Sequence, residues 1–303
     1  MHYLGLDIGG TSVKAGLVDE TGKILESRRA YTVIDDLNAF LFNLTELIRE
    51  FQKSAAIDAI GIGVPGLRGA KTHVIETSPN IPCLKHVNLE QLVADQVQIH
   101  CVSENDANAA AYAESVCGAG VGLQQMAHLT LGTGLGSGFV LNGKLFTGAS
   151  GYGGEFGHTV LRAKPFRKDE GRLCGCGNRG CLETFVSATG IVTTAREHGM
   201  SGPLTSETIY EAAINGDATA LDVFRETGEY LGIAFANLIN LLNLEMIIVG
   251  GGVMASGDLL LDIARETARD YAFPSSFQDC QILKSKLWPD AGVIGAAMLA
   301  RDR

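Results

Sequence analysis

One histidine and three cysteines stand close together in the second half of the sequence. His158 ends the run GEFGH at residues 154–158, and Cys174, Cys176 and Cys181 lie in the run CGCGNRGCLE at 174–183. One imidazole and three thiolates complete a closed tetrahedral Zn²⁺ site, and the glycines permit the tight turns between ligands. A closed site has no open position, so the pattern predicts structural zinc and not a Lewis acid. An ordinary cysteine cluster beside an unrelated histidine is the less favoured interpretation.

A carboxylate lies at the expected start of an Ala-rich helix, in the run ENDANAAA at residues 104–111. The ordinary role of Asn105 and Asp106 would be to cap that helix. Asp106 could instead act as a general base, which accepts the proton of a hydroxyl group as its oxygen attacks a phosphorus atom. This second role requires groups that bind phosphate.

Three glycine-rich segments each follow an expected strand: DIGGT at 7–11, LGTGLGSG at 131–138 and GGGV at 250–253. Glycine lets backbone amides approach a phosphate without an obstructing Cβ. Asp7 could hold Mg²⁺ and Thr11 could donate to a phosphate oxygen, while the third segment offers a flat platform for a base or ribose. Each segment taken alone is also compatible with a simple turn, and for the third segment the turn is the favoured interpretation. The glycine spacing does not fit G-x-G-x-x-G, which disfavours an NAD-dependent dehydrogenase.

Short apolar strands and amphipathic helices alternate along the chain. Strands are expected at Tyr3–Ile8, Val13–Asp19, Ile24–Tyr31, Ala59–Val64, Ile99–Ser103, Met126–Leu131, Ser137–Leu141, Met246–Val249 and Gln281–Lys284. Helices are expected at 36–53, 88–97, 105–116 and 290–303. Asp36 could cap the first of these helices, whose apolar residues lie on one face. The order predicts an α/β protein with two sheet-based lobes and a cleft between them. We place the first lobe at 1–115, with the helix 290–303 packed back on it, and the larger lobe with the zinc loop at 116–289.

Composition and charge restrict the possible partners. The 303 residues include 46% apolar residues and carry a formal net charge of −10, a balance that disfavours nucleic acid and membrane surfaces. The apolar region 231–255 is broken by asparagines and predicts a buried helix and strand, not a membrane span. The N-terminal residues do not resemble a signal peptide, so a cytoplasmic location is expected. The charged stretch Lys164–Arg172, between His158 and Cys174, predicts a solvated surface loop.

Together these motifs resemble the ROK family, whose name joins repressors, open reading frames and kinases. The resemblance extends from Asp7 to the helix after Asp290, and its most specific parts are GEFGH, the cysteine run and ENDANAAA. The three glycine-rich strand ends resemble the phosphate and adenosine elements of the sugar kinase, Hsp70 and actin superfamily. The resemblance therefore implies a two-lobed, ribonuclease H-like α/β fold of the actin-like ATPase and hexokinase superfamily, with a zinc-bound loop.

The resemblance also implies a role for each matching residue. Asp106 matches the catalytic base. The sugar contacts match Asn80, Asn105, Asp106, Glu155, His158 and Glu183. The zinc ligands match His158, Cys174, Cys176 and Cys181. The elements for ATP and Mg²⁺ match Asp7, Gly9, Gly10, Thr11, Lys14, Gly132, Thr133, Gly134, Gly251 and Gly252.

The activity that the resemblance implies is ATP-dependent phosphorylation of the primary 6-hydroxyl of a hexose. Glucose is the first expectation because it is the commonest substrate of the family, and N-acetylglucosamine and N-acetylmannosamine are the alternatives. The shape of the pocket around C2 would separate these sugars, and single residues do not reveal it. A sugar-responsive transcriptional regulator is disfavoured, since such members carry a helix-turn-helix domain before the first phosphate loop. An actin-like structural ATPase would not need the zinc loop. The family often forms dimers, so we expect a homodimer.

Overall fold

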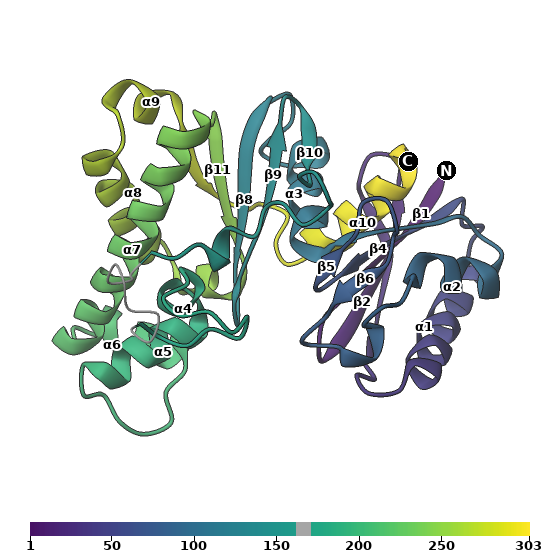
Figure 1. Ribbon diagram of the computed structural model, residues 1–303, viewed down its shortest axis with the longest axis horizontal. Coiled ribbons are helices and arrows are strands. Elements are labelled where there is room, and N and C mark those ends of the chain that lie inside the picture. The colour runs from purple at the N-terminus through teal and green to yellow at the C-terminus, as the bar shows by residue number, and fades with distance from the viewer. Residues whose placement is uncertain (162–170) are drawn as a thin grey trace. The chain divides into compact units, whose positions relative to one another are not determined.

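The computed structural model describes residues 1–161 and 171–303, and its chain divides into two compact units (Figure 1). Unit 1 comprises residues 1–124, 138–154 and 286–303, and unit 2 comprises 125–137 and 155–285. The lobes expected from the sequence, 1–115 and 116–289, stay a prediction about domains, while the compact units place residues 138–154 with the N-terminal part. Residues 164–170 of the predicted charged loop lie outside the described residues.

The sheet of unit 1 has the strand order β3-β2-β1-β4-β7. Its strands are β1 (His2–Ile8), β2 (Ser12–Asp19), β3 (Ile24–Tyr31), β4 (Ala59–Val64) and β7 (Cys101–Asn105). Strands β1, β4 and β7 are parallel, and β2 and β3 are antiparallel additions. The prediction for β7, Ile99–Ser103, was wrong by two residues because its pairing with β4 begins at Cys101 and continues to Asn105. This register carries Asn105 to the carboxyl edge of the sheet.

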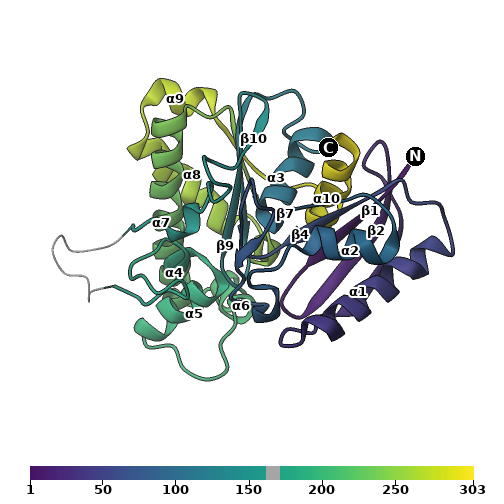
Figure 2. The same ribbon diagram turned by 45° about the vertical axis from the view of Figure 1, so that its right-hand side comes forward.

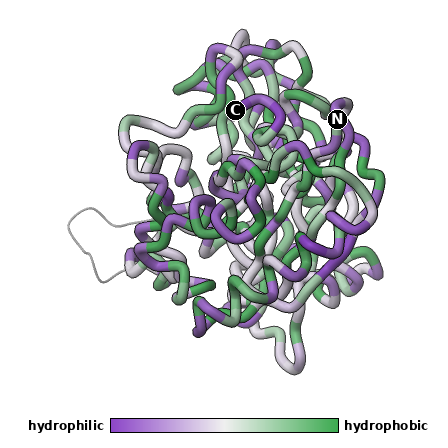
Figure 3. The backbone as a smooth tube through the Cα atoms, turned by 90° about the vertical axis from the view of Figure 1, so that its right-hand side faces the viewer, coloured by the Kyte–Doolittle hydropathy of each residue, from purple (hydrophilic) through white to green (hydrophobic). Residues whose placement is uncertain are grey.

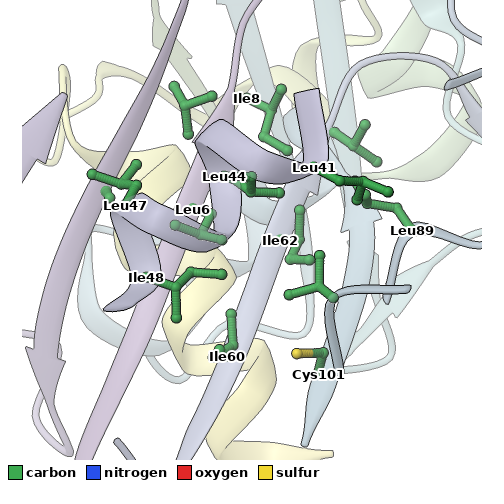
Figure 4. Close-up of a cluster of buried hydrophobic side chains, with 14 of the residues drawn as sticks. Leu6, Ile8, Leu41, Leu44, Leu47, Ile48, Ile60, Ile62, Leu89 and Cys101 are labelled. Atoms are coloured by element: carbon green, nitrogen blue, oxygen red, sulfur yellow. The ribbon is translucent and has the colours of Figure 1, made fainter. Parts of the chain in front are cut away.

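Helices cover both faces of this sheet (Figure 2). One face packs against α1 (Leu37–Gln52) and α2 (Leu89–Val97), and the other against α3 (Asp106–Cys117) and α10 (Ala291–Asp302). Asp36 caps α1 by accepting from the N–H groups of Asn38 and Ala39, at 2.8 and 3.1 Å. The predicted apolar face of α1 is buried and lies over β1 and β4, where Leu41 and Leu44 meet Leu6 and Ile62 (Figure 4).

The C-terminal helix α10 approaches the sheet and α3 at backbone distance. A Cβ on Gly61 of β4 would lie 1.7 Å from the carbonyl oxygen of Ala296, and a Cβ on Gly295 would lie 1.7 Å from that of Ala109. Only glycine permits such close backbone approaches. The expected helix 290–303 therefore packs within unit 1 at its glycines by close backbone contact, and its side chains Val293, Ile294 and Met298 add to the buried core there.

Smaller elements of unit 1 were not expected from the sequence. They are β5 (Leu67–Arg68), β6 (Ile75–Thr77), β10 (Lys144–Phe146) and a 3₁₀ turn, η1 (Pro82–Leu84). Strands β5 and β6 pair with each other, and β10 pairs with β9 (Leu135–Leu141). Runs of two or three residues are too short to show a periodicity, which is why the sequence did not reveal them.

Unit 2 is built on parallel strands followed by helices. The second sheet has the order β10-β9-β8-β11-β12, with β8 (Gln125–Leu131), β11 (Met246–Gly250) and β12 (Gln281–Lys284) parallel. The remaining elements are η2 (Phe156–His158), α4 (Glu183–Val186), α5 (Ala188–Glu197), α6 (Ser206–Ile214), α7 (Ala218–Leu242), η3 (Gly252–Ser256), α8 (Leu259–Tyr271) and α9 (Pro274–Asp279). The predicted helix and strand within 231–255 are the end of α7 and β11.

Polar residues interrupt the apolar segments at short intervals along the chain (Figure 3). Within residues 1–161 and 171–303, no helix combines the length and the apolar character that a membrane crossing requires.

Candidate active site

The carboxyl ends of the parallel strands in unit 1 place Asp7 beside Lys14 and α10. Asp7 and Lys14 are direct partners across β1 and β2, and Lys14 Nζ donates to the carbonyl of Pro289 at 3.2 Å. Burial raises the pKa of Asp7, which the charge of Lys14 lowers in part and that of Asp290 raises further. A Cβ on Gly292 would lie 2.7 Å from Asp7 Cγ, so the carboxyl group rests on the first turn of α10.

The first glycine-rich loop is held in place by hydrogen bonds to its own backbone. Gly9 N–H donates to the carbonyl of Ser12 at 3.0 Å, and the Thr32 hydroxyl donates to the carbonyl of Gly9 at 2.8 Å. Gly10 and Thr11 are exposed, so their part of the loop is the one that can meet a phosphate. A Cβ on Gly10 would lie 3.5 Å from Asn80 Cβ, which places the expected sugar contact beside the loop.

The capping role expected for Asn105 is confirmed by the geometry of α3. Its side-chain oxygen accepts from the N–H groups of Ala107 and Asn108 at 3.0 and 3.1 Å, and its amide donates to the carbonyl of Gly66 at 3.2 Å. Asp106 is the first residue of α3, is half-buried, and accepts from Ala107 N–H through Oδ1 at 2.9 Å. Both residues therefore lie at the carboxyl edge of the sheet, where ligands of α/β proteins bind.

In unit 2 the other two glycine-rich segments lie side by side. They follow the neighbouring parallel strands β8 and β11. Gly251 has φ +95°, and a Cβ there would lie 2.2 Å from the carbonyl oxygen of Leu131, so only glycine fits. The carbonyls of Gly132 and Thr133 accept from Ala188 N–H and the Thr189 hydroxyl at 2.9 and 2.8 Å. The start of α5 thus holds the loop that matches the ATP elements.

The histidine and the three cysteines predicted to bind zinc come together in unit 2. Their ligand atoms all lie within 4.8 Å of one another. His158 Nδ1 is 3.5 Å from Cys174 Sγ, and the sulfurs of Cys176 and Cys181 are 3.7 Å apart. A tetrahedral Zn²⁺ with ordinary bond lengths needs N–S and S–S separations of about 3.5 and 3.8 Å. The four residues therefore fit a closed tetrahedral cation site.

The second ring nitrogen of His158 faces Glu155, one turn of η2 away. His158 Nε2 lies 3.8 Å from Glu155 Oε2. Burial raises the pKa of Glu155, the charge of His158 lowers it, and that of Glu183 raises it. Ser137 Oγ accepts from Phe156 N–H at 3.0 Å and so fixes the turn. This role of Ser137 was not expected from the sequence, because Ser137 lies nineteen residues from Phe156 on another element.

Glu183 connects the cysteine cluster with the loop after β8. Its Oε2 accepts from Leu135 N–H at 2.9 Å, and its Oε1 lies 3.3 Å from Cys174 Sγ. A Cβ on Gly134 would come within 2.2 Å of Oε2, so the carboxylate packs directly on this glycine. A cavity of about 440 Å³ opens beside these groups. It is lined by Thr133, Arg172, Leu173, Cys174, Gly175, Glu183, Thr184, Ser187, Thr189, Gly190 and Thr193.

The prediction of a solvated charged stretch was wrong for Arg172. Its guanidinium donates to the Thr184 carbonyl at 2.8 Å and to Thr194 Oγ1 at 2.9 Å, and it pairs with Glu197. It also stacks on the ring of Phe185, at 4.7 Å from the centroid. A buried guanidinium needs such partners, and only folding brings these four together.

Comparison with solved structures defines the class of protein. A ROK family glucokinase from Streptomyces griseus, crystallised with glucose and AMPPNP, superposes with a TM-score of 0.86 and is 34% identical over 100% of both chains. The protein therefore has the actin-like ATPase fold of sugar kinases.

The family follows from the sequence comparison. The pattern of the ROK family matches residues 3–303, and the chain belongs to this family. It is 34% identical to a glucokinase of Thermotoga maritima, over 100% of this chain and 98% of the relative. It is also 31% identical to a xylose repressor of Caldicellulosiruptor bescii, over 99% of this chain and 78% of the repressor. The resemblance inferred from the motifs is confirmed.

Proposed function

We propose that this protein transfers the γ-phosphoryl group of ATP to the 6-hydroxyl of glucose. The observation that carries the proposal is similarity over the whole chain, at 34% identity, to a ROK glucokinase whose structure contains glucose and AMPPNP. The T. maritima glucokinase, which is 34% identical over 98% of its length, supports the same activity. Hexokinase-type phosphotransfer from ATP is thus the reaction that the residues have to perform.

Asp106 is the proposed general base. The carboxylate accepts the proton of the sugar 6-hydroxyl while that oxygen forms a bond to the γ-phosphorus, the bond from this phosphorus to the β,γ-bridging oxygen breaks, and ADP leaves. One oxygen, Oδ1, is held by Ala107 N–H at 2.9 Å. This hydrogen bond and the rigid start of α3 restrict the carboxylate to few orientations, as a base within reach of its proton requires.

The phosphates are proposed to bind the exposed amides of the glycine-rich loops. Gly10 and Thr11 in unit 1 and Thr133 in unit 2 are exposed, and amides fixed in advance stabilise the charge that develops during transfer. Mg²⁺ prefers oxygen ligands and would be held through Asp7. When bound, it would neutralise charge on the phosphate oxygens.

The sugar hydroxyls are proposed to bind Asn80, Asn105, Glu155, His158 and Glu183. His158 turns Nδ1 toward Cys174 at 3.5 Å, so Nε2 stays available to donate to a hydroxyl. Zinc held by His158 and the three cysteines would fix the imidazole tautomer and the turn that carries Glu155. Loss of the ion should weaken the binding of the sugar before that of ATP.

Other expectations remain predictions. N-acetylglucosamine and N-acetylmannosamine stay alternative substrates. Similarity to a xylose repressor keeps a regulator as the alternative of another class, and a DNA mobility-shift assay would detect it. The cytoplasmic location and the homodimer are likewise expected, and light scattering after gel filtration would measure the latter.

A coupled ADP-release assay across glucose, the two N-acetylhexosamines and fructose tests the activity. Highest kcat/KM with glucose supports the proposal, and no turnover with any hexose overturns it. Asp106→Asn should lower kcat by about 10²–10⁴ while calorimetry still detects glucose binding. Asp36→Asn is the matched control, because it makes the same change in another carboxylate that accepts from backbone N–H groups at the start of a helix. Near-normal turnover of Asp106→Asn would remove Asp106 from the role.

A further inference from the structure

Glu104 is a buried carboxylate that directly precedes Asn105 and Asp106. It is 4% exposed and belongs to β7. The proposed reaction gives it no role, although it is part of the run ENDANAAA. A buried carboxylate is unfavourable unless hydrogen bonds or an opposite charge compensate it, so its partners indicate its purpose.

The groups that donate to one oxygen of Glu104 belong to residues on either side of Asp106 in the sequence. Glu104 Oε1 accepts from Asn105 N–H at 3.0 Å and from Asn108 Nδ2 at 3.2 Å. These groups belong to the residue before Asp106 and to the buried side chain one half-turn after it. Glu104 thereby holds the peptide that enters α3 and the first turn of that helix.

The second oxygen of Glu104 is paired with Arg303. The guanidinium donates to Oε2 at 2.9 Å, with side-chain exposures of 38% for Arg303 and 5% for Glu104. Arg303 reaches this point because α10 packs on α3 and β7. The end of α10 is further tied by the Tyr112 hydroxyl, which donates to Asp302 at 2.6 Å.

We propose that Glu104 and Arg303 are positioning residues for the catalytic base. The pair fixes the junction of β7 and α3 and so sets the direction of the Asp106 carboxylate, an inference that rests on the proposed function. With Arg303 removed, an uncompensated buried charge would remain beside the base, and moving the first turn of α3 toward water would relieve it. Misplacement of a catalytic group lowers the rate of the chemical step more than it lowers substrate binding.

Kinetics of Arg303 variants test the inference. Arg303→Gln should lower kcat about tenfold, which is about 1.4 kcal/mol in the barrier, while KM for glucose and ATP changes by less than about twofold. Arg303→Lys should restore most of kcat, because it keeps the charge and a donor. The matched control is Arg301→Gln, which removes contacts of the neighbouring residue to Asp302 and the Glu20 carbonyl. Its kcat should match that of the wild type.

A double-mutant cycle adds a second measurement. In Glu104→Gln the new amide group would face the Arg303 guanidinium, donor against donor, so kcat should fall. Adding Arg303→Gln removes that mismatch, so the double variant should lose less than the two single losses combined. Thermal unfolding checks that each variant folds.

The outcomes separate this inference from the proposed function. Wild-type kcat in Arg303→Gln, or equal losses in Arg303→Gln and Arg301→Gln, overturns the inference. The same holds if the effects of the double variant simply add. If Asp106→Asn collapses turnover while Arg303→Gln does not, the proposed function stands and only the positioning role fails. If Asp106→Asn turns over normally, the assignment of the base fails, and the positioning role fails with it.

Discussion

Gly134 lies so close to Glu183 that a single added methyl group should displace this carboxylate, which is proposed to bind a sugar hydroxyl. In Gly134→Ala the new Cβ would lie 2.2 Å from Glu183 Oε2, whereas ordinary contact begins at 3.4 Å. The carboxylate must retreat by about 1.2 Å, and its hydrogen bond from Leu135 N–H then stretches to about 4 Å, beyond hydrogen-bonding range. Because the displaced atom is the end of a flexible side chain, the fold itself should tolerate the change.

The size of the effect follows from the hydrogen bond that is lost. A hydrogen bond to a charged group contributes about 1.5–3 kcal/mol, and about 1.4 kcal/mol is tenfold in a dissociation constant. When Cys174 binds a metal as thiolate it no longer donates to Glu183, so the Leu135 N–H becomes more important for holding the carboxylate. We expect the Kd for glucose to rise roughly 10- to 150-fold, and the same lost hydrogen bond should lower Tm by about 2–5 °C while the protein stays folded.

Isothermal titration calorimetry with glucose alone, without nucleotide, measures this prediction. Gly132→Ala is the matched control, because it adds the same methyl group to the same loop and meets no atom of the described residues within 4 Å. Its Kd for glucose should stay within about twofold of the wild type. Wild-type glucose affinity in Gly134→Ala, or equal weakening in both variants, would refute the reasoning.

Three further changes test other parts of the structure. Cys176→Ser leaves three ligands at the proposed zinc site, so mass spectrometry of the purified protein should find the zinc lost, and unchanged zinc content would contradict the assignment. Burial raises the pKa of Asp7 in the folded state, so the folded protein binds more protons there than the unfolded chain does, and this contribution to stability falls as pH rises through the folded pKa. Asp7→Asn should therefore have a higher Tm than the wild type at pH 7, and this gain in Tm should fade as the pH falls toward 3.8, the ordinary pKa of an aspartate. A gain in Tm that stays constant with pH would argue against burial of the charge as the cause. Arg68 pairs with Glu90 at 3.0 Å with side chains 8% and 13% exposed, so Arg68→Ala should lose about 3–5 kcal/mol of unfolding free energy in urea titration, whereas Arg49→Ala, from a pair 47% and 50% exposed, should lose less than about 1 kcal/mol. Equal losses would show that burial is not what makes the Arg68 pair matter.

Local patterns in the sequence were sufficient to predict most of the elements and the clustering of the four candidate zinc ligands. The strands Ile24–Tyr31 and Ala59–Val64 are as predicted, and Asp36 caps α1 as expected, because alternation, helical periodicity and capping act between near neighbours. The spacing of His158 and the cysteines predicted their cluster, since tight glycine turns bring ligands on one loop together. The glycine-rich strand ends predicted where phosphate could bind, and this assignment stays a prediction.

Tertiary structure alone decided what holds these groups in place. Glu183 receives a hydrogen bond from Leu135, forty-eight residues away, and Glu104 is paired with Arg303, one hundred and ninety-nine residues away. Neither pair can be inferred from the periodicity of the sequence, because each depends on how whole helices and strands pack against one another. The course of β7 to Asn105 depended in the same way on its pairing with β4. Residue types thus determined which chemistry is possible, and the packing of distant segments determined the orientation in which each group is held.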